Sequence, residues 1–175
     1  MMKERIQQLA KKYAPEFIEI RHQIHSNPEL SYQEFETSAF VQKKLAEFGI
    51  PFEVKATTGV VGLIKGKNPD KKITALRADM DALPITEEND VPYKSKNNGV
   101  MHACGHDTHT TMLLTAARVL KANESNLNGI VKLLFQPGEE KTPGGASIMI
   151  EQGALQNPTP EIIFGQHINP DAPFL

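Results

Sequence analysis

Residues 101–120 read MHACGHDTHTTMLLTAARVL, a stretch that joins a cluster of metal-ligand side chains to an amphipathic helix. Cys104, His106 and His109 lie there with His102 beside them, so the stretch holds the chain's only cysteine and three of its six histidines. Cysteine thiolate and imidazole are common ligands of zinc and of neighbouring first-row metals. The stretch therefore predicts a metal site. A buried cysteine with unrelated surface histidines is the alternative interpretation.

The spacing within this cluster indicates its local structure. Cys104 and His106 are two positions apart and cannot share a helix face, so we expect them to project from a turn at Gly105. The helix should follow, over residues 108–122, with Asp107 or Thr108 as its cap. Apolar residues then recur at helical spacing, at Met112, Leu113, Ala116, Ala117 and Leu120. Because Cys104 precedes a helix N-terminus, we expect the helix dipole to lower its thiol pKa.

Upstream of the cluster, helical periodicity predicts helices at 3–13 and 15–26, separated or kinked by Pro15. His22 and His25 could share a face of the second helix, but we expect them to be ordinary helix-surface or helix-end residues. A further helix should end at Gly49 and begin at Ser31, with Glu34 completing a capping box.

Strand-like segments surround the predicted helices. They are short, apolar or β-branched, and bounded by turn residues, at 52–56, 60–65, 73–78, 130–135 and 161–165. The last two have little alternation, which predicts strands buried on both faces. A short helix at 146–152 lies between them. Strands interleaved with helices predict an α/β fold with a central, largely parallel or mixed sheet flanked by helices.

Polar side chains follow three of these strands. Asp79 and Asp81 follow the strand at 73–78, Glu139 and Glu140 the strand at 130–135, and His167 the strand at 161–165. Ligands of such sheets collect at the carboxyl ends of strands, so we expect these groups to converge on Cys104 and His106.

The carboxylates in this group leave several roles open. One carboxylate of the adjacent pair Glu139 and Glu140 could bind metal while the other transfers protons. Alternatively, the pair belongs to an exposed acidic loop. Asp79 and Asp81 could bind metal, accept the ring N–H of a metal-bound histidine, or cap the turn after their strand.

Bulk composition excludes several classes of protein. The chain has 175 residues, 39% of them hydrophobic and 23% charged, with a net charge of −2. These values indicate a globular domain with a core of its own. The basic residues form no stripe, so we expect no nucleic-acid partner. No apolar run is long enough for a bilayer, and the first residues lack the apolar region of a signal peptide, so we expect no membrane association and a cytoplasmic location.

Four ordered motifs carry a resemblance to a known family. They are RADMDALP at 77–84, MHACGHDTHT at 101–110, LLFQPGEE at 133–140 and GQH at 165–167, and HSNPELSYQEFET at 25–37 adds to them. Together they resemble the dinuclear-metal aminoacylase and hippurate hydrolase family, which is related to metal-dependent carboxypeptidases. The resemblance implies a zinc-exopeptidase-like catalytic domain.

The resemblance also implies roles for single residues. Cys104 would bridge two divalent metal ions (zinc, manganese, cobalt or nickel), with His106, Glu140 and His167 as further ligands. Glu139 would be the general acid and base. Asp81 would support the ligands. Asp79 stands where related exopeptidases have a ligand histidine.

The implied activity is metal-dependent hydrolysis of the amide bond of N-acyl amino acids, of the hippurate or N-acetyl type. A deacetylase of N-acetyl-diaminopimelate type, a catalytically inactive fragment or metal-binding module, and a thiol hydrolase using Cys104 are the alternatives. Family members are longer, with a lid and dimerisation domain and a further ligand histidine. We therefore expect residues 1–175 to be the N-terminal part of the catalytic domain, with little activity alone and an uncovered apolar surface. The full-length form is expected to be a homo-oligomer.

Overall fold

Five strands form one mixed sheet, in the order β1-β2-β4-β3-β5, in the computed structural model, which describes residues 2–169. The strands are β1 Phe52–Lys55, β2 Gly59–Lys65, β3 Ile73–Asp79, β4 Ile130–Gln136 and β5 Ile162–Gly165. Strands β3, β4 and β5 run parallel, whereas β2 is antiparallel to both β1 and β4. The predicted α/β fold with a mixed sheet is confirmed.

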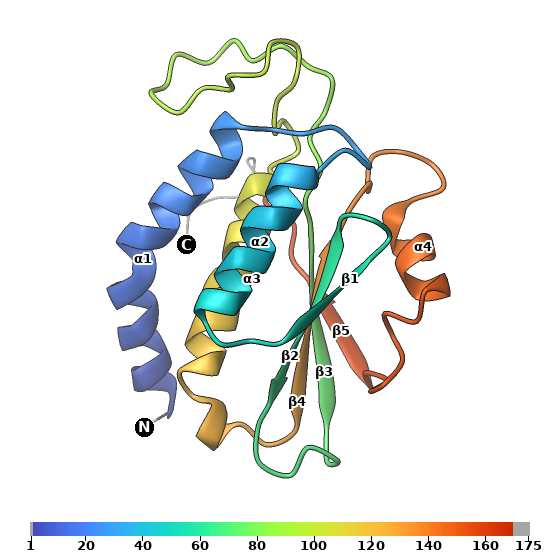
Figure 1. Ribbon diagram of the computed structural model, residues 1–175. Helices are drawn as coiled ribbons and strands as arrows, with labels where there is room; N and C mark the ends of the chain where they lie inside the picture. Colours follow the sequence, from blue (N-terminus) through green and yellow to red (C-terminus); the bar gives the residue numbers. More distant parts are fainter. Residues whose placement is uncertain (1, 170–175) are drawn as a thin grey trace.

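Helices cover both faces of this sheet (Figure 1). The helices are α1 Met2–Ser26, α2 Phe35–Glu47, α3 His106–Lys121 and α4 Gly145–Glu151, and a 3-10 turn spans Glu124–Asn126. The first three lie on one face and α4 lies on the other. No helix within residues 2–169 is long and apolar enough to cross a membrane.

Strand β4 lies at the centre of the sheet, and its sequence serves two cores. Leu133 and Phe135 join the larger core beneath α1, α2 and α3, whereas Leu134 joins the smaller core beneath α4. Successive side chains of a strand point to opposite faces, so a strand between two cores needs an uninterrupted apolar run. Lys132 interrupts it, and its buried ammonium donates to the carbonyls of Ala154 and Gln156, each at 2.8 Å. The predicted two-sided burial of this strand is confirmed.

The N-terminal helices differ from the prediction in two ways. Helix α1 is one continuous helix that contains Pro15, so Pro15 does not separate two helices, and Phe17 and Ile20 of its second half lie in the larger core. The predicted capping box at Ser31 and Glu34 is wrong. Helix α2 begins at Phe35, and Glu34 makes no capping hydrogen bond.

A carboxylate from further upstream caps α2 instead. Glu29 accepts hydrogen bonds from the backbone N–H groups of Glu36 and Thr37, at 3.1 and 2.8 Å, and from the Thr37 hydroxyl at 2.8 Å. These bonds satisfy N–H groups that the first helical turn cannot pair internally. Ser31 and Glu34 are thereby free to make other contacts.

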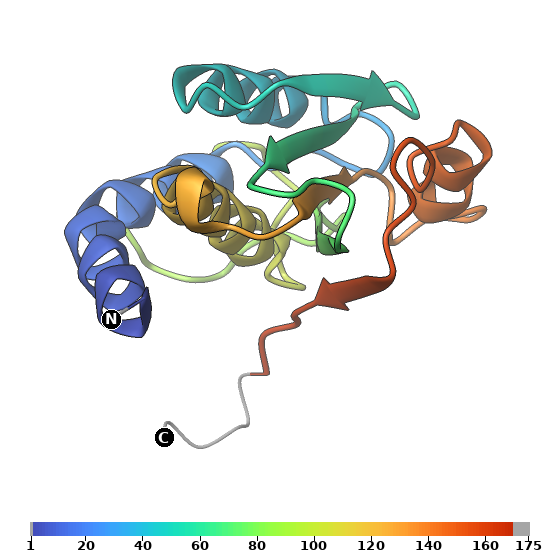
Figure 2. The ribbon, with the colours of Figure 1, turned by 90° about the horizontal axis from the view of Figure 1, so that it is seen from below.

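Strand β5 differs from the prediction as well, because it is exposed along its whole length. Ile162, Ile163 and Phe164 are 40%, 45% and 53% exposed. Within residues 2–169 the strand pairs only with β3, at the edge of the sheet, and it leads away from the body of the molecule (Figure 2). Its apolar sequence therefore gives an uncovered sheet surface, as expected, and not a buried strand.

The parallel strands end at one edge of the sheet, and α3 begins there. Asp79 at the end of β3 is in register with Gln136 at the end of β4, and Arg77 with Gly165 at the end of β5. The Thr110 hydroxyl in the first turns of α3 donates to the carbonyl of Asp79 at 2.8 Å. The motifs after all three strands thus meet the N-terminus of α3.

Candidate metal centre

The turn ahead of α3 presents Cys104 and His106, as the spacing predicts. Gly105 between them has a φ of +82°, a left-handed conformation that glycine adopts without the steric cost of a Cβ atom. An added Cβ would also overlap the side chain of Ile168, which packs on this glycine. Helix α3 begins at His106 without a side-chain cap, so the cap predicted at Asp107 or Thr108 is wrong.

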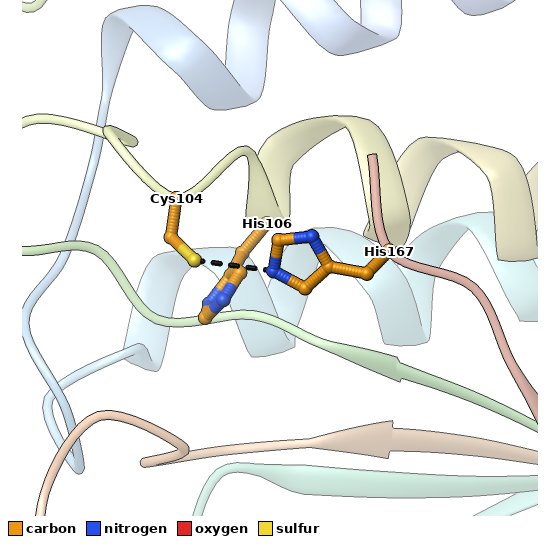
Figure 3. Close-up of side chains that lie close together, drawn as sticks. All are labelled: Cys104, His106 and His167. Atoms are coloured by element: carbon orange, nitrogen blue, oxygen red, sulfur yellow. Dashed lines mark hydrogen bonds between the residues drawn. The ribbon is translucent and has the colours of Figure 1, made fainter. Parts of the chain in front are cut away.

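The turn lies beside the segment after β5. Cys104 Sγ is 3.3 Å from His167 Nε2, and the His106 ring reaches the same place (Figure 3). Ligand atoms of Cys104, His106 and His167 all lie within 4.8 Å of one another. Those of His106, Glu139 and Glu140 do so as well. Residues that follow β4 and β5, together with the N-terminus of α3, therefore gather around one imidazole.

Asp81 holds several of these groups in place. Its carboxylate is 3.2 Å from His106 Nδ1 and accepts hydrogen bonds from the Ser31 hydroxyl at 2.6 Å and from the backbone N–H groups of Glu139 and Glu140 at 3.1 and 3.0 Å. Burial alone would raise the pKa of Asp81, but these hydrogen bonds outweigh it and lower the pKa to about 2. A carboxylate on the far ring nitrogen of a metal-binding histidine fixes its tautomer and orientation.

The other nitrogen of His106 suits a cation-binding site. His106 Nε2 is buried and has no hydrogen-bond partner among the described residues. It faces carboxylate oxygens of Asp79 and Glu140, each at 3.7 Å, and of Glu139 at 4.0 Å. Buried polar atoms in native structures are almost always paired, so the unpaired nitrogen among acidic oxygens fits a divalent cation.

The expected low pKa of Cys104 is wrong for the metal-free protein. Burial of the thiol, together with the negative charges of Glu140, Asp79 and Glu139, raises its pKa to about 11. A thiol with this pKa is a poor nucleophile on its own. A bound cation would offset the negative charge, since metal coordination deprotonates a thiol.

The sequence grouped His109 with the metal-ligand side chains of residues 101–120, and the structure places it between Asp79 and the segment after β5. Its Nδ1 is 2.7 Å from Asp79 Oδ1, and its Nε2 accepts the backbone N–H of Ile168 at 3.1 Å. Asp79 also pairs with Arg77 at 2.6 Å. Because Ile168 follows His167 directly, His109 anchors the segment that carries this imidazole. The helical spacing of His106 and His109 was the available signal, since residues three apart share a helix face.

Comparison with known proteins assigns the chain to a family. Residues 75–174 match the model described as peptidase family M20/M25/M40, which is more than half of the sequence. The chain belongs to this family. It is 53% identical over 156 residues to hippurate hydrolase of Campylobacter jejuni, covering 89% of this chain and 40% of that protein. It is 49% identical over 157 residues to N-acetyl-L-cysteine deacetylase of Bacillus subtilis, covering 89% and 37%.

A solved structure of an M20 protein supports the same assignment. The Bacillus subtilis YXEP protein, described as a dinuclear metal binding peptidase of the M20 family, superposes with a TM-score of 0.87 at 40% identity. The match covers 93% of this chain and 45% of that one. The chain thus spans about two fifths of the length of the curated relatives named above.

This M20 family chain also contains a buried charge network next to the candidate metal centre. Asp107, next to His106, accepts from Arg21 Nε at 2.7 Å and lies 2.8 Å from His25 Nδ1. His25 Nε2 lies 3.1 Å from Glu87. The hydrogen bond to Asp107 raises the pKa of His25. The network ties α1 to the start of α3. His25 is therefore a structural residue, and its helix neighbour His22 stacks on the ring of Tyr93 instead.

Proposed function

We propose that these residues form the metal centre of an amidohydrolase that cleaves N-acyl amino acids. In this proposal Cys104, His106, Glu140 and His167 bind two divalent metal ions, and Glu139 is the general acid and base. The observation that carries the proposal is the gathering of thiol, imidazole and carboxylate groups around the unpaired Nε2 of His106. The names of the hydrolase and deacetylase relatives support the substrate class.

The ions, when bound, would supply Lewis-acid polarisation of the scissile carbonyl and favour ionisation of the attacking water. The protein's own residues supply proton transfer. The Glu139 side chain is 41% exposed, and its carboxylate lies 4.0 Å from His106 Nε2, so it borders the centre and is open to water and substrate. Glu140 is less exposed, at 24%, and lies closer to His106, at 3.7 Å, which suits a ligand.

The reaction follows from this division of roles. Water transfers a proton to the Glu139 carboxylate while its oxygen adds to the acyl carbonyl carbon. The carbon–nitrogen bond then breaks, and Glu139 returns the proton to the leaving amine. A carboxylic acid and a free amino acid are the products. The raised pKa of Cys104 argues against the alternative in which its thiol is the nucleophile.

We also propose that residues 1–175 form the N-terminal part of a larger metallopeptidase-like catalytic domain. The support is the length of the relatives and the uncovered apolar surface of β5. The activity therefore belongs to the whole protein, and hydrolysis should be measured on a chain of the relatives' length that contains these residues.

Glu139→Gln and Glu140→Gln are the decisive pair of variants. Glu139→Gln should keep its metal content and lose at least ~100-fold in turnover, as expected for a missing general base. Glu140→Gln should lose metal and activity together. Metal content is measured by elemental analysis, and turnover with hippurate, N-acetyl amino acids and N-acetyl-diaminopimelate in the presence of zinc, manganese, cobalt or nickel. Loss of metal in Glu139→Gln would make that residue a ligand, and hydrolysis of none of these substrates would refute the proposed activity.

A further inference from the structure

Glu34 is a completely buried carboxylate that belongs neither to a helix cap nor to the candidate ligand set. Its Oε1 accepts the backbone N–H groups of Tyr32 and Gly138, at 2.9 and 2.7 Å, and its Oε2 accepts the Thr58 hydroxyl at 2.8 Å. Burying a carboxylate is costly unless hydrogen bonds compensate for the lost water. Gly138 directly precedes the Glu139–Glu140 pair, so this buried group reaches the backbone of the candidate site.

Two buried carboxylates together hold this turn. Glu34 accepts the N–H of Gly138, and Asp81 accepts the N–H groups of Glu139 and Glu140. Residues 137–140 lie outside the helices and strands, so no regular ladder of hydrogen bonds fixes them. The directions of the two glutamate side chains therefore depend on these three N–H bonds. Glu34 supplies the first of the three.

Tyr32 supports the same turn from the side. Gly138 has a φ of +54°, and a Cβ atom there would overlap the Tyr32 ring. The Tyr32 hydroxyl donates to the carbonyl of Lys141 at 2.8 Å and accepts the N–H of Gly144 at 2.9 Å. The ring and Glu34 therefore confine the turn at its beginning, while the hydroxyl secures the residues that follow it.

We propose that Glu34 is a positioning residue that fixes the Gly138–Glu140 turn and thereby orients Glu139 and Glu140 at the metal centre. The proposal rests on the proposed function for the roles of these two glutamates. In this role Glu34 needs the length of its side chain and an acceptor oxygen, but not a negative charge. Burial raises the pKa of Glu34, although its hydrogen bonds lower it in part.

Three variants of Glu34 separate the effect of side-chain length from the effect of charge. Glu34→Gln keeps the length and the acceptor Oε1 but removes the charge, and Thr58 can accept from the new amide. Glu34→Asp keeps the charge, but the side chain is one methylene shorter and cannot maintain the bonds to Tyr32 and Gly138 together. Glu34→Leu removes every acceptor. The matched control is Glu29→Leu, which removes three side-chain hydrogen bonds from the same segment, all of them to the start of α2.

The first measurement is Co²⁺ affinity, which is monitored through the absorption of the cobalt–thiolate bond at Cys104. Residues that support metal ligands typically contribute 10–100-fold in affinity. We expect about a tenfold loss in Glu34→Asp and up to a hundredfold loss in Glu34→Leu. The Co²⁺ affinities of Glu34→Gln and Glu29→Leu should stay within about threefold of that of the unsubstituted protein, a change well below the 10–100-fold range.

The second measurement needs no metal and no activity. Amide hydrogen exchange of Gly138, Glu139 and Glu140 should become faster in Glu34→Asp and stay slow in Glu34→Gln. Unchanged affinity and exchange in Glu34→Asp would overturn the proposal, even if Glu34→Leu does not fold. The reverse order, with Glu34→Gln the weaker binder, would also overturn it and assign the effect to charge. Absence of hydrolysis in the longer protein would refute the proposed function but leave both measurements of Glu34 valid.

Discussion

Replacing Gly105 by alanine should separate the stability of the protein from the geometry of the proposed metal centre. The matched control is Gly99→Ala. Both glycines have positive φ values, +82° and +78°, so an alanine at either position is strained by the same backbone conformation. They differ in their surroundings. An added Cβ at Gly99 meets nothing within 4 Å, whereas one at Gly105 overlaps the side chain of Ile168.

The structure predicts similar losses of stability in the two variants. A left-handed conformation costs an L-residue roughly 1–2 kcal/mol. The reduced freedom of the unfolded chain offsets about 0.4–1 kcal/mol of that cost. Each variant should therefore lose about 1 kcal/mol, which lowers the melting temperature of a chain of this size by about 2–4 °C. The overlap at Gly105 adds little to this, because Ile168 is 37% exposed and can turn toward solvent.

Metal affinity should differ between the two variants. Ile168 anchors the segment of His167 by packing on Gly105 and by its N–H bond to His109. Gly105→Ala removes the first anchor, so we expect about a tenfold loss of Co²⁺ affinity, the lower end of the range for supporting residues. Gly99→Ala should bind as the unsubstituted protein does. Melting is followed by circular dichroism with chelator present, and affinity by cobalt titration. Equal affinities in the two variants would refute the role given to Ile168.

Two further predictions concern stability. His25 has a raised pKa because of its bond to Asp107, so its contribution to stability is fully present below the unfolded value of 6.5 and is lost as the pH rises through the folded value. Urea unfolding with chelator present should therefore show stability falling above pH 6.5, and a His25→Gln variant with an unchanged slope would contradict this. Leu114, completely buried between α3 and the sheet, should lose 2–5 kcal/mol on replacement by alanine. A loss below about 1 kcal/mol, typical of exposed positions, would show that α3 is loosely packed.

The sequence predicted the fold well where periodicity and burial coincide. Strand β4 is an example, since its apolar run serves a core on each face. The same reasoning failed for β5, whose sequence is equally apolar. A run of apolar residues indicates that a strand needs cover, but the cover comes from other parts of a protein, and β5 pairs only with β3 within the described residues. Exposure at a sheet edge is therefore decided by topology, which the local sequence does not contain.

The candidate site was predictable as a set of residues but not in its electrostatics. The strand-end rule indicated where Cys104, His106 and the glutamate pair would gather, because parallel strands end at one edge. The pKa of Cys104 was predicted in the wrong direction. The helix dipole, which lowers a thiol pKa, could be inferred from residues next to Cys104, but the carboxylates that raise the pKa could not. The carboxylates of Asp79 and Glu140, which raise the pKa, come from other strand ends. The distance of these carboxylates from the thiol depends on how the strands pair in the folded protein.

The incorrect helix caps have one physical cause. Ser31 and Asp107 stand where a short polar side chain can cap a following helix, and Glu34 stands where a capping box has its glutamate, which is why local pattern assigns them to these roles. In the structure they bond to Asp81, to Gly138 and to His25, all more than 40 residues away in sequence. Glu29 and the glycine turn at 105 make such caps unnecessary. A metal centre built on turns needs its backbone and ligands held by buried polar groups, and nearby residues that are able to cap a helix supply those groups.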